Sequence, residues 1–107
     1  MLEIKDSVAV ITGGGGRIGL EVATHWVRNG GRVVIADISA ELLHAPEAEL
    51  KEIGGEVLAV ATDITKEDDN AKLADAAIEQ FGQINLVAPF AGEVFFIHGG
   101  LRLDSKG

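Results

Sequence analysis

Four consecutive glycines, Gly13–Gly16, constrain the fold of this chain more than any other feature of its sequence. The run before them, Val8–Ile11, is apolar and rich in β-branched residues, which predicts a buried strand. After them, apolar side chains recur at helical spacing at Ile18, Val22, Ala23, Trp26 and Val27. Because glycine adopts backbone conformations that other residues avoid, the four glycines are expected to form a sharp turn from a strand into a helix.

The alternation of strand and helix continues along the chain. Further strands are predicted at 32–37, 56–63 and 84–88, and helices over 39–53 and 65–81, each helix followed by glycine. The order is therefore β-α-β-α-β-α-β. Buried strands that alternate with helices predict an α/β fold with a parallel sheet, and right-handed crossovers make that sheet doubly wound. A length of 107 residues fits a single domain over 1–107.

Three local features refine this prediction. Ser39 is a good N-cap for the second helix, and Pro46 inside that helix is expected to kink it or to delay its start. Thr65 and Asp68 have the spacing of a capping box for the third helix. Proline cannot donate a hydrogen bond within a sheet, so Pro89 is expected to end the fourth strand one residue earlier.

Composition excludes several classes of function. A formal net charge of −8 argues against binding to nucleic acid, which depends on neutralising phosphates with basic residues. The chain has no cysteine for disulfides or thiolate metal sites, and its histidines lack metal-ligand spacing, so no metal site is expected. It has neither a run of about 18 apolar residues for a membrane span nor a signal peptide. We therefore expect a cytoplasmic protein.

The glycines also carry a functional pattern. Gly14, Gly16 and Gly19 fit G-x-G-x-x-G between a strand and a helix, and Asp37 ends the next strand. In this context the pattern is the dinucleotide-binding fingerprint of the Rossmann fold. The first glycine permits the turn, the second lets the backbone approach a pyrophosphate, and the third lets helix and strand pack closely. A P-loop is excluded, because it needs Lys followed by Ser or Thr where this chain has Leu20-Glu21.

Two charged residues bear on which dinucleotide would bind. Asp37 is placed to accept hydrogen bonds from the adenosine ribose, and its charge would repel a 2′-phosphate, so it favours NAD over NADP. Arg17 lies in the phosphate loop and could pair with a pyrophosphate or with that 2′-phosphate. S-adenosylmethionine is an alternative ligand, although proteins that bind it usually have an acidic residue just before the loop, where this chain has Ile11-Thr12.

In combination, Thr12-Gly13 through Ile18-Gly19, Asp37, Asp63-Ile64-Thr65 and the segment FGQINLVAPFAG resemble the N-terminal half of the short-chain dehydrogenase/reductase family. The resemblance covers nearly the whole chain. It implies a cofactor site in which a pyrophosphate turn is followed by an adenosine ribose acceptor, an adenine pocket and a stretch beside the nicotinamide ribose. The residues expected in these four parts are, in order, Gly13, Gly14, Gly15, Gly16, Arg17, Ile18 and Gly19; Asp37 and Ile38; Asp63 and Ile64; Ala91 and Gly92.

The chain departs from the family in three respects. Its T-G-x-x-G-x-x-G spacing differs from the T-G-x-x-x-G-x-G of the compact branch, and Pro89-Phe90 stand where the family usually has two asparagines. It has no tyrosine, whereas the family's catalysis uses Ser, Tyr and Lys from its C-terminal half, so no catalytic residue is expected here.

The resemblance implies the cofactor-binding part of a longer oxidoreductase that transfers hydride between a nicotinamide and an alcohol or carbonyl substrate. A sensor or interaction module that binds NAD(P) without turnover is the alternative. In either case the fourth strand is expected to have an open edge, which predicts a homo-oligomer.

Overall fold

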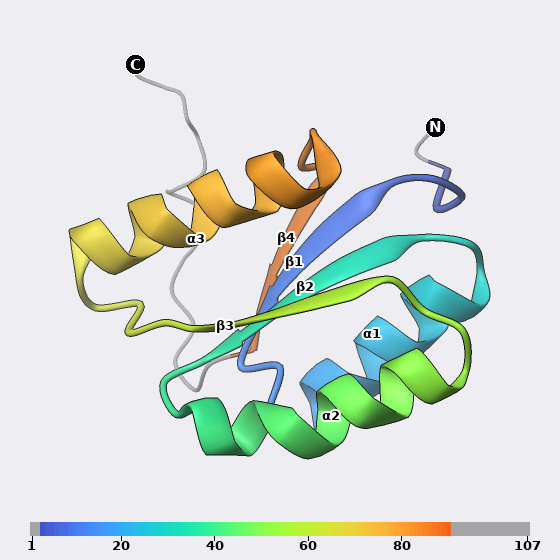
Figure 1. Ribbon diagram of the computed structural model, residues 1–107, viewed down its shortest axis with the longest axis horizontal. Helices are drawn as coiled ribbons and strands as arrows, with labels where there is room; N and C mark the ends of the chain where they lie inside the picture. The colour runs from blue at the N-terminus through green and yellow to red at the C-terminus, as the bar shows by residue number, and fades with distance from the viewer. Residues whose placement is uncertain (1–2, 91–107) are drawn as a thin grey trace.

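The computed structural model describes residues 3–90, and over this range the predicted alternation of strands and helices is confirmed (Figure 1). The structure places a turn or loop between each pair of successive elements. In chain order the elements are β1 (Val8–Thr12), α1 (Arg17–Arg28), β2 (Arg32–Asp37), α2 (Ala40–Glu52), β3 (Val57–Ala61), α3 (Glu67–Phe81) and β4 (Leu86–Pro89).

The four strands form one parallel sheet in the order β3-β2-β1-β4. Thr12, the last residue of β1, is paired with Ala36 of β2 on one side and with Pro89 of β4 on the other. Because all strands run in the same direction, their carboxyl ends meet at a single edge, at the lower left of Figure 1. The loops that enter α1, α2 and α3 all leave from this edge, so the expectation of a doubly wound sheet is confirmed.

Helices cover both faces of the sheet, with α1 and α2 on one face and α3 on the other (Figure 1). Alternate residues of the central strands point to opposite faces, which separates the core into two clusters. Ile11 and Ile35 pack with Trp26 and Leu50 beneath α1 and α2. On the other face, Val10 and its neighbours pack beneath α3, in a cluster of Val8, Val10, Val34, Ala36, Leu73 and Ala77.

At the amino edge of the sheet, side chains satisfy the exposed backbone groups. The Arg32 guanidinium and the Gln83 side-chain amide each donate to the carbonyl of Asp6 at 2.8 Å. The backbone N–H of Val8 donates to the Asn85 side chain at 2.8 Å. Arg32 also lies over the ring of Phe81, with its guanidinium carbon 5.4 Å from the ring centre. This edge is closed by contacts between residues distant in sequence.

The second helix confirms one local prediction and corrects part of another. The Ser39 hydroxyl accepts a hydrogen bond from the N–H of Glu41 at 3.2 Å, as expected of an N-cap. Pro46 does not delay the start, because α2 begins at Ala40 and continues through the proline. Pro46 is itself buried with Leu43 and Leu50, so packing against the sheet holds the residues on both sides of it. Leu42, on the same helix, is 51% exposed.

The third helix begins differently from the prediction. The prediction of a capping box at Thr65 and Asp68 is wrong, because α3 begins at Glu67. Its N-cap residue is Lys66, whose side chain makes no capping hydrogen bond. The Thr65 hydroxyl is instead 2.6 Å from the carboxylate of Asp63, to which it donates. Asp63, at the end of the preceding strand, thus competes successfully for the hydroxyl that would have capped the helix.

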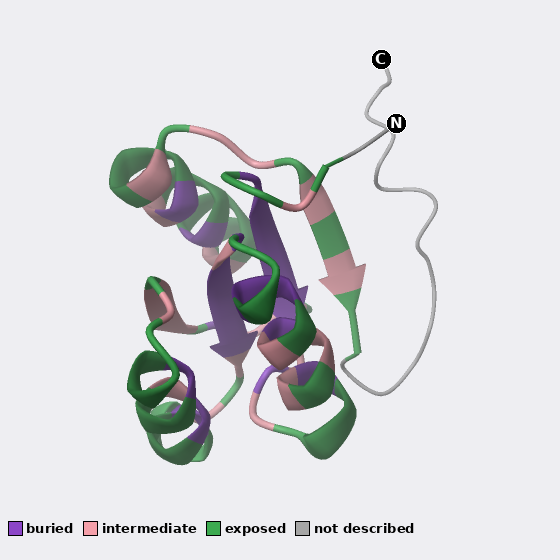
Figure 2. Ribbon diagram, turned by 90° about the vertical axis from the view of Figure 1, so that its right-hand side faces the viewer, coloured by how far each residue is buried: buried purple, intermediate pink, exposed green. Residues whose placement is uncertain are grey.

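The fourth strand extends through Pro89 rather than ending at Ala88. Phe90, the next residue, donates its N–H to the carbonyl of Thr12 at 2.9 Å. Successive residues of a strand direct their N–H groups to opposite sides, so the nitrogen of Pro89 faces away from β1, where no donor is needed. Within residues 3–90, β4 is an edge strand, and it alternates between half-buried and exposed residues (Figure 2), with Val87 53% exposed.

Candidate functional site

The glycine turn at the carboxyl edge is fixed by backbone hydrogen bonds. Gly13 has a φ of 75°, in the left-handed region that favours glycine. The N–H of Gly16 donates back to the carbonyl of Gly13 at 3.0 Å, which closes the turn. The N–H of Gly14 donates to the carbonyl of Ala36 at 2.9 Å. The turn is therefore attached to the end of the neighbouring strand β2 as well as to β1.

Close packing leaves no room for a Cβ at Gly14, Gly15 or Gly19, and the contacts are shortest at Gly14 and Gly19. A Cβ at Gly14 would lie 2.7 Å from the Cβ of Ile35, and a Cβ at Gly19 would lie 2.6 Å from the carbonyl oxygen of Gly13. At Gly16 the nearest atom to a Cβ would be 3.5 Å away, an ordinary contact. The absence of a side chain at Gly14 therefore lets the glycine turn pack against β2. Its absence at Gly19 lets the first turn of α1 pack against the glycine turn. Packing places no such requirement on Gly16, so another explanation is needed for a glycine there.

The N-terminus of α1 opens directly from this turn. Gly16 is the N-cap and has no side chain to offer, and the first intrahelical bond is from Leu20 N–H to the Gly16 carbonyl at 3.0 Å. The N–H groups of Arg17, Ile18 and Gly19 consequently have no intrahelical acceptor. Uncapped N–H groups and the positive end of the helix dipole together favour an anion at this position. Ile18 lies beside them with its side chain 63% exposed.

Asp37 ends β2 immediately beside the turn. One carboxylate oxygen, Oδ2, accepts from the N–H of Gly15 at 3.0 Å, and the other, Oδ1, accepts from the N–H of Ile38 at 2.8 Å. The carboxylate is partly exposed, and Ile38 is exposed. The structure thus brings an acceptor-only group next to the anion-favouring helix start, as the fingerprint predicts.

Asp63 lies two residues beyond the end of β3, at the same edge of the sheet. The Thr65 hydroxyl and the Thr65 N–H, at 2.6 Å and 3.0 Å, both donate to its Oδ1. These hydrogen bonds, the hydroxyl first, hold the pKa of the Asp63 carboxyl below its ordinary value of 3.8, because they stabilise the ionised form. Ile64 follows and is partly buried. Both residues therefore lie at the carboxyl edge of the sheet.

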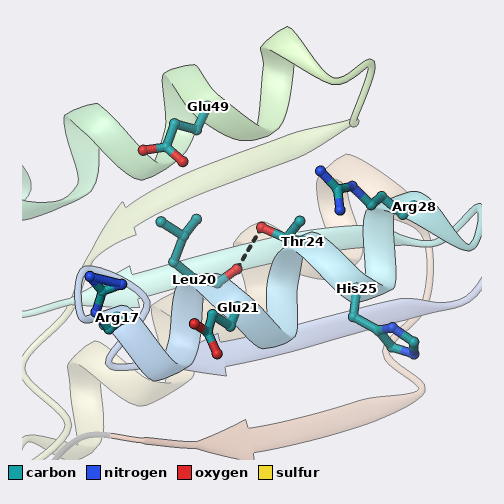
Figure 3. Close-up of a pocket in the computed structure, with 7 residues that line it drawn as sticks. All are labelled: Arg17, Leu20, Glu21, Thr24, His25, Arg28 and Glu49. Atoms are coloured by element: carbon teal, nitrogen blue, oxygen red, sulfur yellow. Dashed lines mark hydrogen bonds between the residues drawn. The ribbon is translucent and has the colours of Figure 1, made fainter.

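Arg17 has a second environment on the outer surface. A shallow hollow of about 410 Å³ lies along α1 and faces α2 (Figure 3). Its lining combines the basic Arg17 and Arg28 with the acidic Glu21 and Glu49, and Thr24 donates to the Leu20 carbonyl within it. Arg17 is the only lining residue that belongs to the predicted cofactor site. Arg17 is exposed, and it is the first residue of α1, directly after the glycine turn.

The structure brings most of the predicted cofactor-site residues to one edge of the sheet. They come from the turn, the start of α1, the end of β2 and the end of β3, and their individual contacts with a cofactor remain predictions. Ala91 and Gly92 lie outside the described residues. The sequence did not indicate Leu42, whose Cβ and carbonyl oxygen would lie 2.8 Å and 2.9 Å from a Cβ at Gly15.

The described residues also bear on a metal site and on a membrane-spanning helix. Among residues 3–90 there is no group of three or more His, Asp or Glu side chains arranged to hold a metal ion. Within that range, too, none of the helices has both the length and the apolar character needed to cross a membrane.

The sheet order and the glycine turn define the Rossmann class of doubly wound α/β folds. Residues 7–99 match the sequence family described as short chain dehydrogenase, so the chain belongs to the short-chain dehydrogenase/reductase family. It is 37% identical over 91 residues to the 1-deoxy-11-beta-hydroxypentalenate dehydrogenase of Streptomyces exfoliatus, a match that covers 85% of this chain and 33% of that protein. It is 35% identical over 91 residues to the 7alpha-hydroxysteroid dehydrogenase of Escherichia coli K12, covering 85% and 36% respectively.

Solved structures show the same similarity. A short chain dehydrogenase/reductase from Burkholderia phymatum in complex with NAD superimposes with a TM-score of 0.79 at 37% identity, over 81% of this chain and 31% of that one. A 7 alpha-hydroxysteroid dehydrogenase complexed with NADH and 7-oxo glycochenodeoxycholic acid gives a TM-score of 0.76 at 34% identity, over 79% and 33%. The chain thus spans about a third of the length of the relatives it matches.

Proposed function

We propose that residues 1–107 are the dinucleotide-binding part of an oxidoreductase that transfers hydride between a nicotinamide cofactor and an alcohol or carbonyl substrate. The observation that carries this proposal is the contact between the glycine turn and Asp37, with Gly15 N–H 3.0 Å from the carboxylate. It sets an acceptor for ribose hydroxyls directly beside an uncapped helix N-terminus. The similarity to dehydrogenases, one of them solved with NAD and another with NADH, supports the same function.

The residues present fit such a cofactor. The first-turn N–H groups of α1 would hold the pyrophosphate. The open space at Gly16 would admit it, since among residues 3–90 the nearest atom outside the adjoining backbone lies 3.5 Å from a Cβ there. Asp37 would accept from the adenosine ribose, and the exposed Ile38 would lie against the adenine with Asp63 and Ile64. The nicotinamide supplies the hydride chemistry when it is bound. The described residues contribute binding and orientation.

Within this function, NAD is favoured over NADP. The negative charge of Asp37 would repel a 2′-phosphate on the ribose it binds. Arg17 has the opposite effect, but its side chain is exposed on the first turn of α1 and has no fixed partner among the described contacts. A charge held by two backbone donors weighs more than an exposed charge that solvent screens. We therefore expect Asp37 to determine the preference.

Titration with NADH and with NADPH tests the proposal. Energy transfer from Trp26, the single tryptophan, to the reduced nicotinamide reports binding directly. We expect saturable binding of both nucleotides, with a higher affinity for NADH than for NADPH. In Asp37→Ala we expect the ratio of the two affinities to become smaller, mainly because the affinity for NADH falls. The exposed Asp75→Ala on α3 is the matched control and should leave both affinities unchanged. If neither nucleotide binds the folded protein, the proposal is wrong.

We also propose that the protein self-associates. The outer edge of β4 carries unpaired backbone groups within residues 3–90, and Val87 and Phe90 beside it are exposed. Sedimentation velocity over a range of concentrations tests this, and a monomer at every concentration would contradict it. The relatives named above are dehydrogenases, and no contact among residues 3–90 favours a sensor without turnover.

A further inference from the structure

Asp37 makes more contacts than a ribose acceptor requires. Its two oxygens accept from two different backbone N–H groups, Gly15 at 3.0 Å and Ile38 at 2.8 Å. Its own carbonyl accepts from the N–H of Thr62 at 2.7 Å, which ties the end of β3 to the same residue. The bond to Gly15 joins segments 22 residues apart in sequence and therefore restrains the turn from outside it.

Gly15 is enclosed on the other side by α2. A Cβ on Gly15 would lie 2.8 Å from Asp37 Oδ2, 2.8 Å from the Cβ of Leu42 and 2.9 Å from the Leu42 carbonyl oxygen. That carbonyl has no helical donor four residues on, because Pro46 occupies the position and lacks an N–H. The Gly15 N–H thus has one charged acceptor at hydrogen-bonding distance, and the backbone around it is held between Asp37 and Leu42.

The two roles of the carboxylate are compatible. An ionised carboxylate offers about four acceptor positions on its two oxygens. The N–H groups of Gly15 and Ile38 occupy two of them, so about two remain for the two hydroxyls of a ribose. Binding at Asp37 therefore does not require the bond to the glycine turn to break.

We infer that Asp37 is a positioning residue for the glycine turn: its carboxylate holds Gly15, and through it the pyrophosphate-binding backbone, in the conformation that binds the cofactor. This inference rests on the proposed function and deepens it, because it assigns to one side chain both the recognition of the ribose and the alignment of the phosphate site. A residue that only recognised ribose would affect only ligands that carry the ribose hydroxyls.

Binding of a truncated ligand separates the two roles. The probes are NADH and an NADH analogue whose adenosine ribose lacks both hydroxyls. We expect Asp37→Ala to lower the affinity for the analogue by about tenfold, which is the usual effect of losing one hydrogen bond to a charged group. Asp75→Ala is again the control. If Asp37→Ala weakens NADH but leaves the affinity for the analogue unchanged, Asp37 recognises ribose only and the inference is wrong.

Amide hydrogen exchange of the protein without nucleotide gives a second, independent readout. We expect Asp37→Ala to speed exchange at Gly15 by tenfold or more, while amides of the central strands, such as that of Val34, keep their protection and report an intact fold. Asp37→Asn, which keeps the shape but can accept from only one of the two donors, should have an intermediate effect. Unchanged exchange at Gly15 in both variants would overturn the inference, even if no nucleotide binds the wild-type protein and the proposed function fails.

Discussion

The two ends of the parallel sheet use their polar groups in opposite ways. At the amino end, backbone groups at the start of β1 and just before it form hydrogen bonds with the side chains of Arg32, Gln83 and Asn85. These contacts close the edge. At the carboxyl end, the start of α1 is left uncapped by a glycine, and the nearest side chain, Asp37, is an acceptor. The same sheet therefore has one end built for stability and one end where donors remain available to a ligand.

The largest effect is expected at the closed end, from Gly31→Ala. A Cβ at Gly31 would clash with the indole of Trp26, which is buried and cannot move aside. Overpacking of this kind costs about 1–3 kcal/mol, and we expect the free energy of unfolding in urea to fall by an amount near the upper value. The folded fraction should bind NADH normally. A weakened affinity without a loss of stability would contradict the separation of the two ends.

At the open end, Gly19→Ala and Gly16→Ala are expected to behave differently. At Gly19 a Cβ meets a backbone carbonyl at 2.6 Å, but alanine also favours the helix by about 1 kcal/mol, so the net loss of stability should be about 1–2 kcal/mol. Gly16→Ala makes only ordinary contacts and should cost at most about 1 kcal/mol. It should nevertheless lower the affinity for NADH more than tenfold, because the methyl group occupies the approach of the pyrophosphate.

Denaturation and calorimetric titration of the two variants check this prediction. Gly16→Ala separates stability from binding most clearly, since its predicted effects on the two quantities are of different size. Normal binding by Gly16→Ala would remove the functional explanation for a glycine at that position.

A smaller effect is expected from Arg32→Met at the closed end. Methionine keeps much of the apolar stem but removes the hydrogen bond to the Asp6 carbonyl and the contact with the Phe81 ring. Against this loss, it also removes the buried Arg32 Nε, which has no hydrogen-bond partner among the described residues. We expect a loss of about 0.5–1 kcal/mol by chemical denaturation. An affinity for NADH that differs from the wild type would show that the two ends are coupled.

The smallest effect is expected from Thr65→Ala beside Asp63. Losing the hydroxyl should raise the pKa of the Asp63 carboxyl toward 3.8, which an NMR titration of its carboxyl carbon measures. Because the folded-state pKa is depressed, the stabilising contribution is present above pH 3.8 and is lost as the pH falls through the folded-state pKa. The variant should therefore lose less stability than the wild type over that acidic range. If the pKa of Asp63 is the same in Thr65→Ala as in the wild type, the hydrogen bond from the Thr65 hydroxyl is not the cause of the lowered pKa.

The sequence predicts the parts of this molecule that follow from periodicity and chain direction. The glycine turn could be placed because a buried strand and a helical pattern flank Gly13–Gly16, and Asp37 because parallel strands end at a common edge. Contacts that depend on how separate segments approach each other could not be predicted. The bond from Gly15 to Asp37 and the exposed position of Leu42 belong to this group.

The wrong predictions have a similar cause. Thr65 has the right spacing for a capping box, but spacing along the chain does not show that Asp63 is the closer acceptor for its hydroxyl. Pro46 could delay the start of a helix by its local chemistry, yet α2 begins at Ala40 and the proline is buried within it beside Leu43 and Leu50. In both cases a nearby or tertiary contact outweighs the preference that a short window of sequence expresses.

The central position of β1 has a consequence for how the protein is made. The strand leaves the ribosome before both of its neighbours in the sheet, and β2 and β3 follow it within residues 32–61. Its other neighbour, β4, arrives only with residues 86–89. Until β4 is present, one side of β1 has no partner strand, and only its pairing with β2 on the other side holds it in the sheet. The nascent chain thus passes through a stage in which its future centre is an exposed edge.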